Sequence, residues 1–139
     1  MYICMARAPA GFRAHDTASQ GAIRAVVAEQ MAMWGAGDGA RCARHVAPEV
    51  SFPNLLGMVI YAGPAFVERH KQILAGFYKG PTKRQSIRRI GFVTPDVAIV
   101  DIDNEIRQVT AMPAGIAVPA DDVIRTHLME VVSRRQKRW

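Results

Sequence analysis

The side chain best placed for chemistry in this sequence is a histidine in the stretch "AFVERHKQIL", residues 65–74. His70 follows Phe66 and precedes Leu74 by four residues each, so it lies within the apolar stripe of a predicted helix. An imidazole titrates at about pH 6.5 and can serve in a pocket as a base or a hydrogen-bond donor. The alternative is a structural role, with a neutral ring bonded to a backbone carbonyl.

A second candidate base lies in the final strand-like stretch, "DVIRTHLMEVVSRR". In one register the inward side chains are Ile124, Thr126, Leu128, Glu130 and Val132, and in the other they are Val123, Arg125, His127, Met129 and Val131. Burial would raise the pKa of Glu130 and make it a candidate base, whereas the other register offers His127. The first register is favoured because it buries fewer polar groups.

Two amides could donate to a ligand. Asn104 is the lone polar residue on the inward face of "VAIVDIDNEIRQV". A buried amide without partners costs about 1–3 kcal/mol, so protein, water or ligand must satisfy it. Asn54 follows Pro53 and either contacts a ligand or holds its own turn through its side chain, and the turn is favoured.

Three carboxylates in the same stretch suggest acid–base chemistry, but their positions argue against it. Asp101, Asp103 and Glu105 alternate with the apolar residues, so we expect them to point away from the interior. Across the sheet they should meet the cations of the preceding strand, Lys83, Arg84, Arg88 and Arg89.

The elements that position these residues are predicted from periodicity and turn chemistry. We expect a helix over about residues 19–35, a short helix capped by Asp38 with Ala40, Ala43 and Val46 on its apolar side, and a third from Gly63–Pro64 to "KGP" at 79–81. The runs "EVSF" and "MVIY" predict a small hairpin. Three long strands follow, so the class is α+β, with helices covering one face of a curved antiparallel sheet.

Composition limits the function classes. The 139 residues suit one domain, and 18 Lys and Arg against 12 Asp and Glu give a net charge of +6. The cations cluster in "KGPTKRQSIRR" and "RRQKR". Such runs are usually solvated strand faces, and the acids of residues 101–105 should neutralise part of them, so we expect no nucleic-acid partner.

Cysteine and histidine usage points to a reducing compartment and no metal. Cys4 and Cys42 are too few for a disulfide framework, which indicates the cytoplasm. The four histidines lack ligand spacing, and no run of 18 or more apolar residues predicts a membrane span. We expect a flexible tail over residues 1–16 and a single domain over residues 17–139.

The order of several landmarks resembles the NTF2-like superfamily, and within it the SnoaL-like group that includes the SgcJ/EcaC-type proteins. The landmarks are Trp34, the Gly37–Asp38 step, Phe52, Asn54, Gly57, Gly63, His70 and Pro95–Asp96 before an apolar strand. The resemblance spans roughly residues 20–139.

This resemblance implies a cystatin-like cone, in which a strongly bent antiparallel sheet wraps around three helices and leaves a pocket at its open end, often in a homodimer. Related proteins include ketosteroid isomerases, polyketide cyclases, dehydratases and epoxide hydrolases, and others only bind. The candidate contacts of a small apolar or polycyclic ligand are Trp34, Phe52, Asn54, Phe66, Phe77, Asn104 and Thr126. The alternative for the four aromatic residues, which is favoured, is a core position, with only some of them lining the cavity. His70 or Glu130 would act as the base, with no organic cofactor. The alternative is a non-catalytic binding or dimerisation module that uses the outer sheet face.

Two departures from the family pattern stand out. The last hairpin usually leads into a tryptophan and one further strand, whereas here "RRQKR" precedes Trp139 and the sequence stops. Without that strand the sheet has an unpaired edge, so we expect either that the final strand is missing from this sequence or that a partner chain covers the edge. Ketosteroid isomerases place a carboxylate base near the end of the first strand, and "SFPN" has none.

Overall fold

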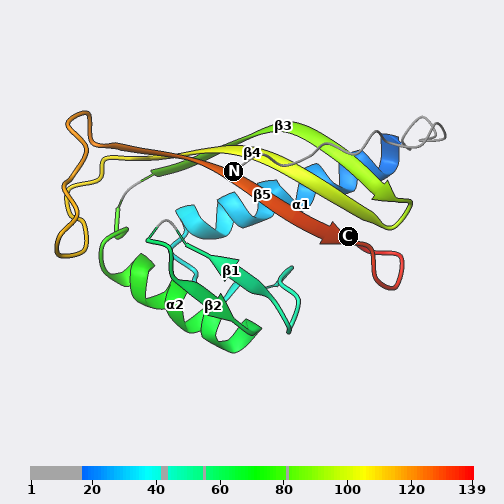
Figure 1. The fold of residues 1–139 in the computed structure, drawn as a ribbon, viewed down its shortest axis with the longest axis horizontal. Coiled ribbons are helices and arrows are strands. Elements are labelled where there is room, and N and C mark those ends of the chain that lie inside the picture. The colour runs from blue at the N-terminus through cyan, green and yellow to red at the C-terminus, as the bar shows by residue number, and fades with distance from the viewer. Residues whose placement is uncertain (1–16, 42–43, 55, 81) are drawn as a thin grey trace.

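The protein is described by a computed structural model over residues 17–41, 44–54, 56–80 and 82–139. The elements in chain order are α1 (Thr17–Gly35), β1 (Ser51–Pro53), β2 (Val59–Tyr61), α2 (Gly63–Ala75), β3 (Thr82–Thr94), β4 (Val97–Arg107) and β5 (Val123–Ser133). The strands form two antiparallel sheets, β1–β2 and β3–β4–β5. Both helices and the β1–β2 hairpin lie on one side of the long sheet (Figure 1). The predicted α+β arrangement is confirmed.

The end of α1 is fixed by glycine chemistry. Gly37 has a φ of 68° and donates its N–H to the Trp34 carbonyl, while the Asp38 N–H bonds to the Met33 carbonyl at 3.0 Å. This pair of bonds is a Schellman motif, which favours glycine at the left-handed position. At Gly39 an added Cβ would lie 2.5 Å from the backbone nitrogen of Lys71, so the loop packs on α2 only because this residue lacks a side chain.

The structure describes two helices rather than the predicted three. Residues 39–40 and 44–45 form turns, Arg41 has a 3-10 conformation, and Cys42 and Ala43 lie outside the described residues. Asp38 does accept the Arg41 N–H, at 3.0 Å. The segment is bounded by glycine and Pro48, which leaves too few residues for a helix to be stable without an extensive packed face.

Helix α2 begins as predicted but ends early. Its buried side chains are Phe66, His70 and Leu74, so the histidine does lie within the apolar stripe. The helix ends at Ala75, because Gly76 leaves the helical conformation with φ −108° and ψ −109°; Pro81 lies outside the described residues. As a result Phe77 is 40% exposed.

The long sheet keeps strict alternation of faces. In β4 the buried residues are Ala98, Val100, Ile102, Asn104 and Ile106. Asn104 pairs in register with Gln85 of β3 and Thr126 of β5. A bulge between Ile87 and Arg89 sends two successive arginines outward before the alternation resumes. In β5 the register with Glu130 inward is confirmed.

The core consists of two apolar clusters that meet near Asn104. The first contains Met33, Trp34, Phe66, Leu74, Ile106, Val109 and Ile124, and the second contains Ile23, Val27, Phe92, Ala98, Val100 and Ile102. Trp139 packs against the second cluster, with its ring centroid 5.7 Å from that of Phe92. In β4, Asn104 falls between the residues of the two clusters, so the polar position divides the core.

Candidate functional site

Polar side chains cross the inward face of the sheet at one level. Asn104 is 5% exposed, and its Nδ2 donates to Thr126 Oγ1 at 3.0 Å. Asn104 Oδ1 and Gln85 Oε1 are buried and have no hydrogen-bond partner among the described residues. Because unpaired buried polar atoms are rare in native proteins, these two oxygens mark a place where a ligand or ordered water would bind.

Helix α1 places Trp34 opposite this row. Trp34 is 7% exposed, and its Nε1 likewise has no partner among the residues described. Lys83 Nζ lies 4.4 Å from the centroid of the Trp34 ring, and the Tyr78 ring centroid lies at 5.3 Å. Lys83 was predicted to point outward with its neighbouring arginines. It instead shares the inward parity of Gln85 and Ile87.

His70 lies beside Trp34 in an aromatic environment. Its ring stacks on Phe66 with centroids 3.9 Å apart, and it meets Phe52 edge-on at 5.5 Å. Nδ1 lies 2.9 Å from the Phe66 carbonyl, so this nitrogen must carry the proton and donate it. Burial lowers the pKa of His70, the Phe66 carbonyl opposes that shift, and nearby Lys83 and Arg69 lower it further. The neutral ring therefore presents a lone pair on Nε2.

Glu130 faces inward from β5 and is half-buried. Burial raises the pKa of Glu130, while Lys83 and a hydrogen bond from Gln30 oppose the rise. The competing candidate, His127, points outward and lies 3.2 Å from Asp103 through Nδ1. Of the two candidate bases in β5, Glu130 is therefore the one that faces the interior. Its raised pKa means that it keeps a proton to a higher pH than an exposed carboxyl does.

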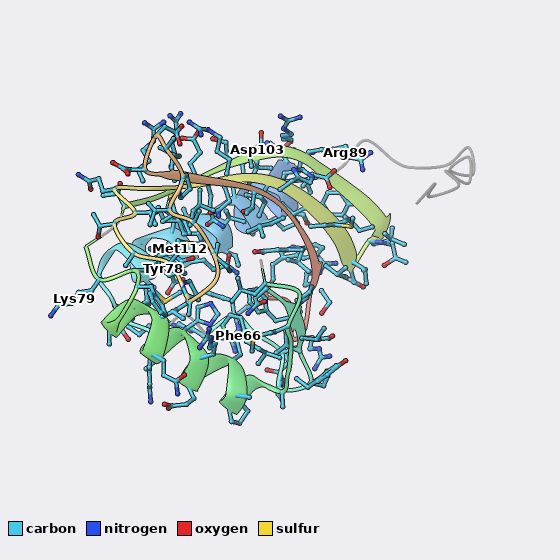
Figure 2. All side chains as sticks on the ribbon, turned by 60° about the vertical axis from the view of Figure 1, so that its left-hand side comes forward. Phe66, Tyr78, Lys79, Arg89, Asp103 and Met112 are labelled. Carbon is cyan, nitrogen blue, oxygen red and sulfur yellow. The ribbon has the colours of Figure 1, made fainter. Side chains whose placement is uncertain are left out.

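The remaining predicted pocket residues divide into two groups. Phe66 and the half-buried Phe52 contact each other and His70, with 5.0 Å between the two phenyl centroids. Asn54 Oδ1 accepts the backbone N–H groups of Leu56 and Met58 at 2.9 and 3.0 Å, so its side chain holds its own turn. Phe77 lies outside the cluster because α2 ends before it. Figure 2 shows Phe66 directed from α2 into the interior and Lys79 directed away from the molecule.

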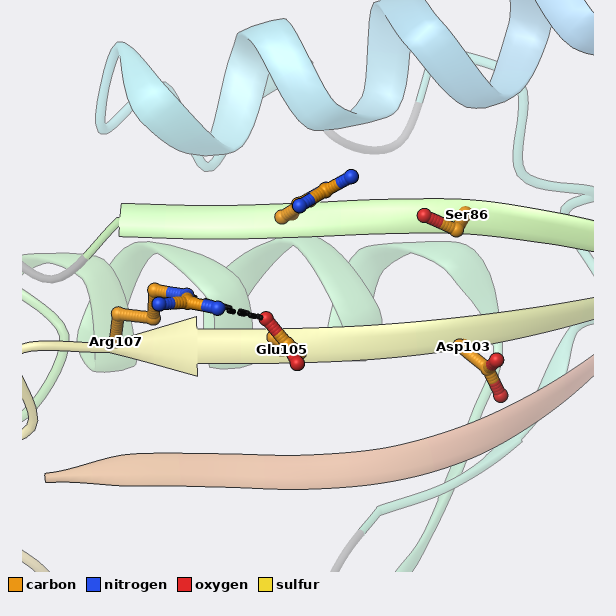
Figure 3. A pocket seen from close by; sticks show the side chains of 5 residues that line it. Ser86, Asp103, Glu105 and Arg107 are labelled. Atoms are coloured by element: carbon orange, nitrogen blue, oxygen red, sulfur yellow. Dashed lines mark hydrogen bonds and ion pairs between the residues drawn. The ribbon is translucent and has the colours of Figure 1, made fainter. Parts of the chain in front are cut away.

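Two open hollows lie on the described part of the chain. One, of about 260 Å³, lies on the outer sheet face between Arg84, Ser86, Asp103, Glu105 and Arg107 (Figure 3). The other, of about 200 Å³, lies between α1 and β3 and is lined by Arg24, Val27, Ala28, Met31, Gln85 and Ile87. Neither is lined by His70 or Glu130. The second shares Gln85 with the inward polar row but is lined by neither Trp34 nor Asn104.

The carboxylates of the outer face are paired with cations. Arg88 Nε donates to Asp103 and Arg89 Nε to Asp101 at 2.9 Å. Glu105 accepts from Arg107 at 2.6 Å. The hydrogen bond from Arg88 lowers the pKa of Asp103, as that from Arg107 lowers the pKa of Glu105. Asp103 and Glu105 therefore stay ionised at neutral pH and are poor general acids.

Sequence reasoning missed Lys83, Gln85 and the indole N–H of Trp34 as site groups. The signal was available in β3, since Lys83 and Gln85 share the parity of Ile87, but the basic run was interpreted as one solvated face. Among the described residues, no three His, Cys, Asp or Glu side chains are grouped to hold a metal ion. In the same part of the chain, neither helix is long and apolar enough to cross a membrane.

Solved structures of similar shape define the fold. A domain of unknown function with a cystatin-like fold from Nostoc punctiforme matches with a TM-score of 0.72 and 19% identity, covering 89% of this chain and 73% of that one. An NTF-2 like protein of unknown function from Shewanella oneidensis gives 0.71 and 12%, covering 87% and 92%. A type 2 hexachlorocyclohexane dehydrochlorinase (LinA) gives 0.69 and 14%, covering 88% and 79%.

No protein-family model and no curated protein sequence matches the chain. The structural matches establish its fold, which is the cystatin-like fold of NTF2-like proteins.

Proposed function

We propose that this protein is a small-molecule-binding member of the SnoaL-like, SgcJ/EcaC-type group and that it moves a proton on its ligand without an organic cofactor. The ligand lies between α1, α2 and the inward sheet face. The observation that carries the proposal is the set of three buried atoms, Trp34 Nε1, Gln85 Oε1 and Asn104 Oδ1, that have no partner among the described residues. Each unpaired atom costs about 1–3 kcal/mol, which a hydrogen-bonding ligand or ordered water offsets.

Two groups on this side of the sheet support proton transfer. His70 keeps its Nδ1 proton on the Phe66 carbonyl, so Nε2 can accept a proton from a ligand. Glu130 has a raised pKa because of burial and can exchange a proton nearer to neutral pH than an exposed carboxyl. The LinA dehydrochlorinase shares this fold, which supports such chemistry as one use of the scaffold.

The test is exchange of the α-protons of a ketone in deuterated water, followed by proton NMR with 2-tetralone and cyclohexanone as probes. The wild-type protein should accelerate exchange over buffer, and His70→Gln should abolish the acceleration. His127→Gln is the matched control, since that histidine points outward. Rates equal to buffer for the wild type, together with no retained ligand in native mass spectrometry, would contradict the proposal.

A second candidate function is self-association through the outer sheet face, as in a dimerisation module. Met129 and Val131 are 59% and 71% exposed, and Val131 pairs in register with Ile99. The flanking charges, Arg89 with Asp101, are already matched within the chain, so a second copy could cover the apolar part without stranding a charge. We expect native mass spectrometry to show a homodimer that Val131→Lys dissociates. Tyr61→Lys, at an equally exposed site on β2, should leave the dimer intact.

A further inference from the structure

Strand β5 forms one edge of the long sheet. It pairs with β4 in unbroken register over its whole length, and no other described strand pairs with it. The opposite edge strand, β3, has two register shifts and four cations, features that discourage pairing with another chain. β5 has neither a register shift nor a proline. A long, regular edge of this kind is a template for a further strand.

The backbone groups that face the open edge of β5 follow from the two hydrogen bonds just after the strand. The Arg134 N–H donates to the Asp96 carbonyl on the β4 side at 2.8 Å, and the Arg135 N–H donates to the Arg138 carbonyl on the other side at 2.7 Å. Because the register with β4 has no shift, this alternation continues back through the strand. The odd-numbered residues from 123 to 133 therefore turn their N–H and C=O groups to the open edge.

The chain itself begins to cover this edge after β5. Arg135 and Arg138 pair across a two-residue turn, whose central residues Gln136 and Lys137 have φ values of 50° and 63°. Positive φ at both positions is the type I′ geometry, which matches the twist of paired strands. The turn returns the chain antiparallel to β5, but the described pairing stops at Arg138. The edge thus suits an antiparallel strand, and the eleven residues of β5 stay open to one.

The inward side chains along this edge are incompletely covered. Ile102 of β4 is fully buried, whereas Leu128 and Val132 of β5, which pack against the same apolar cluster, are half-buried. An added strand would place alternate side chains beside them and remove apolar surface from water. Glu130 lies between them, but it accepts a hydrogen bond from Gln30 of α1, so it does not guard the edge as a free inward charge would.

The neighbours of this edge favour a single extended segment over a second folded copy. Arg135 forms an ion pair with Glu49, just before β1, at 2.7 Å. At the other end of β5, Ile124 belongs to the apolar cluster on which Phe52 of β1 and Ile60 of β2 pack. The β1–β2 hairpin therefore flanks β5 on the side of the sheet that carries the helices (Figure 1). A second copy that continued the sheet would bring its own helices to that same side.

The charge at this edge favours an acidic segment. Lys137 and Arg138 are exposed and form no ion pair with a described residue. The chain as a whole carries a net charge of +6. Opposite charges on neighbouring strands stabilise their pairing, so carboxylates on an added strand would meet unmatched cations here.

We propose that the open edge of β5 binds an extended acidic peptide, a segment of another protein, as an antiparallel strand. Alternate apolar side chains of the peptide face Leu128 and Val132, and an acidic residue at its N-terminal end lies near Lys137 and Arg138. Main-chain hydrogen bonds hold the peptide, and these side chains select it. The inference does not depend on the proposed proton transfer.

The probe is the peptide acetyl-DVTTTVEVEV-amide carrying fluorescein, and its binding to the full chain is measured by fluorescence anisotropy. N-methylation of its third and fifth residues, whose N–H groups face β5, should weaken binding about tenfold or more. N-methylation of its fourth and sixth residues, whose N–H groups face away, should change binding at most a few-fold. Absence of binding, or equal binding of the two methylated peptides, overturns the proposal.

Variants of the chain test the same edge. Met129→Pro removes an N–H that faces the edge without breaking a bond to β4, so it should weaken binding about tenfold or more. Met129→Ala is the matched control and should cost at most a few-fold, because it keeps the N–H. If Met129→Pro does not fold, the methylated peptides decide. Lys137→Gln with Arg138→Gln should weaken binding at low salt, and unchanged binding overturns the choice of an acidic peptide.

Amide hydrogen exchange distinguishes the occupants of the edge. In the free protein the N–H groups of His127 and Met129 should exchange faster than those of Leu128 and Glu130, and bound peptide should slow them. Slow exchange in dilute free protein would mean that the chain already covers its own edge. Slowing that appears only at high protein concentration would identify a second copy as the occupant. Either result overturns the proposal.

Discussion

The two faces of β4 place polar groups in opposite circumstances. On the outer face, Asp101, Asp103 and Glu105 each meet an arginine within the same sheet. On the inner face, Asn104 donates a hydrogen bond from Nδ2 to Thr126, and its Oδ1 has no partner in the described structure. The charged side chains of β4 are thus paired on the face that water also reaches. On the buried face, the amide oxygen of Asn104 has no partner among the described residues.

This difference distinguishes the two faces more clearly than charge or cavity size does. The larger hollow lies on the outer face, but its charged walls include the Arg107–Glu105 ion pair, which matches charge within the chain. Pairing lowers the pKa of Asp103 and Glu105, whereas burial raises that of Glu130 on the inner face. Unpaired buried groups and a carboxyl with a raised pKa occur together only on the inward side of the described sheet.

The largest expected contrast between the faces concerns packing. Ile102 is fully buried, so Ile102→Ala should lower the free energy of unfolding by about 2–5 kcal/mol through lost burial and the cavity left behind. Val131→Ala on the outer face, where the side chain is 71% exposed, should change it by about 0.5 kcal/mol or less. Urea unfolding measures both, and equal losses would show that the outer face is also covered.

The next contrast is in pH dependence. Burial lowers the pKa of His70 below its ordinary value of 6.5, so below that pH the unfolded chain binds a proton that the folded protein excludes. His70 thus makes stability fall as the pH is lowered through 6.5. Burial raises the pKa of Glu130 above 4.5, so its contribution is complete below pH 4.5 and is lost as the pH rises through its folded-state pKa.

Single variants separate these opposing terms in urea unfolding between pH 4.5 and 6.5. His70→Gln should flatten the rise of stability with pH, and Glu130→Gln should steepen it. Asp103→Asn on the outer face should leave the profile unchanged above pH 4.5, since an arginine holds the pKa of Asp103 below 3.8. A profile for His70→Gln that superimposes on the wild type would contradict a neutral, buried histidine.

How far the sequence predicts these features depends on whether a local pattern decides them. Period two in β4 correctly placed Val100 and Ile102 inward and the acids outward, because alternation in a strand is a covalent property of the backbone. Helical spacing failed to place Phe77, because the end of α2 depends on the conformation of Gly76 rather than on apolar spacing. No local pattern predicted the place of Lys83 over Trp34, because that is a tertiary contact between residues 49 apart in sequence.

A smaller effect is expected from removing the inner polar pair. Asn104→Leu with Thr126→Val deletes both partners and the unpaired oxygen, so stability should stay the same or rise by about 1 kcal/mol or less. Binding of 2-tetralone should weaken at the same time. Ser86→Ala, at an exposed outward position immediately before Ile87, is the control and should change neither. A loss of stability above about 2 kcal/mol would instead show that the pair is a structural requirement.

The smallest expected effect is the loss of an outer ion pair. Arg88 and Asp103 have side chains that are 67% and 39% exposed, and water and salt weaken charge pairs at such positions. Arg88→Gln with Asp103→Asn should therefore have a urea midpoint indistinguishable from the wild type in about 0.5 M salt, where charges are screened within a few ångströms. A clear loss that persists in high salt would mean that the pair is shielded from solvent. Because this chain alone leaves both residues exposed, the shield would have to be a second copy, and the outer face would then be an interface with its charges desolvated.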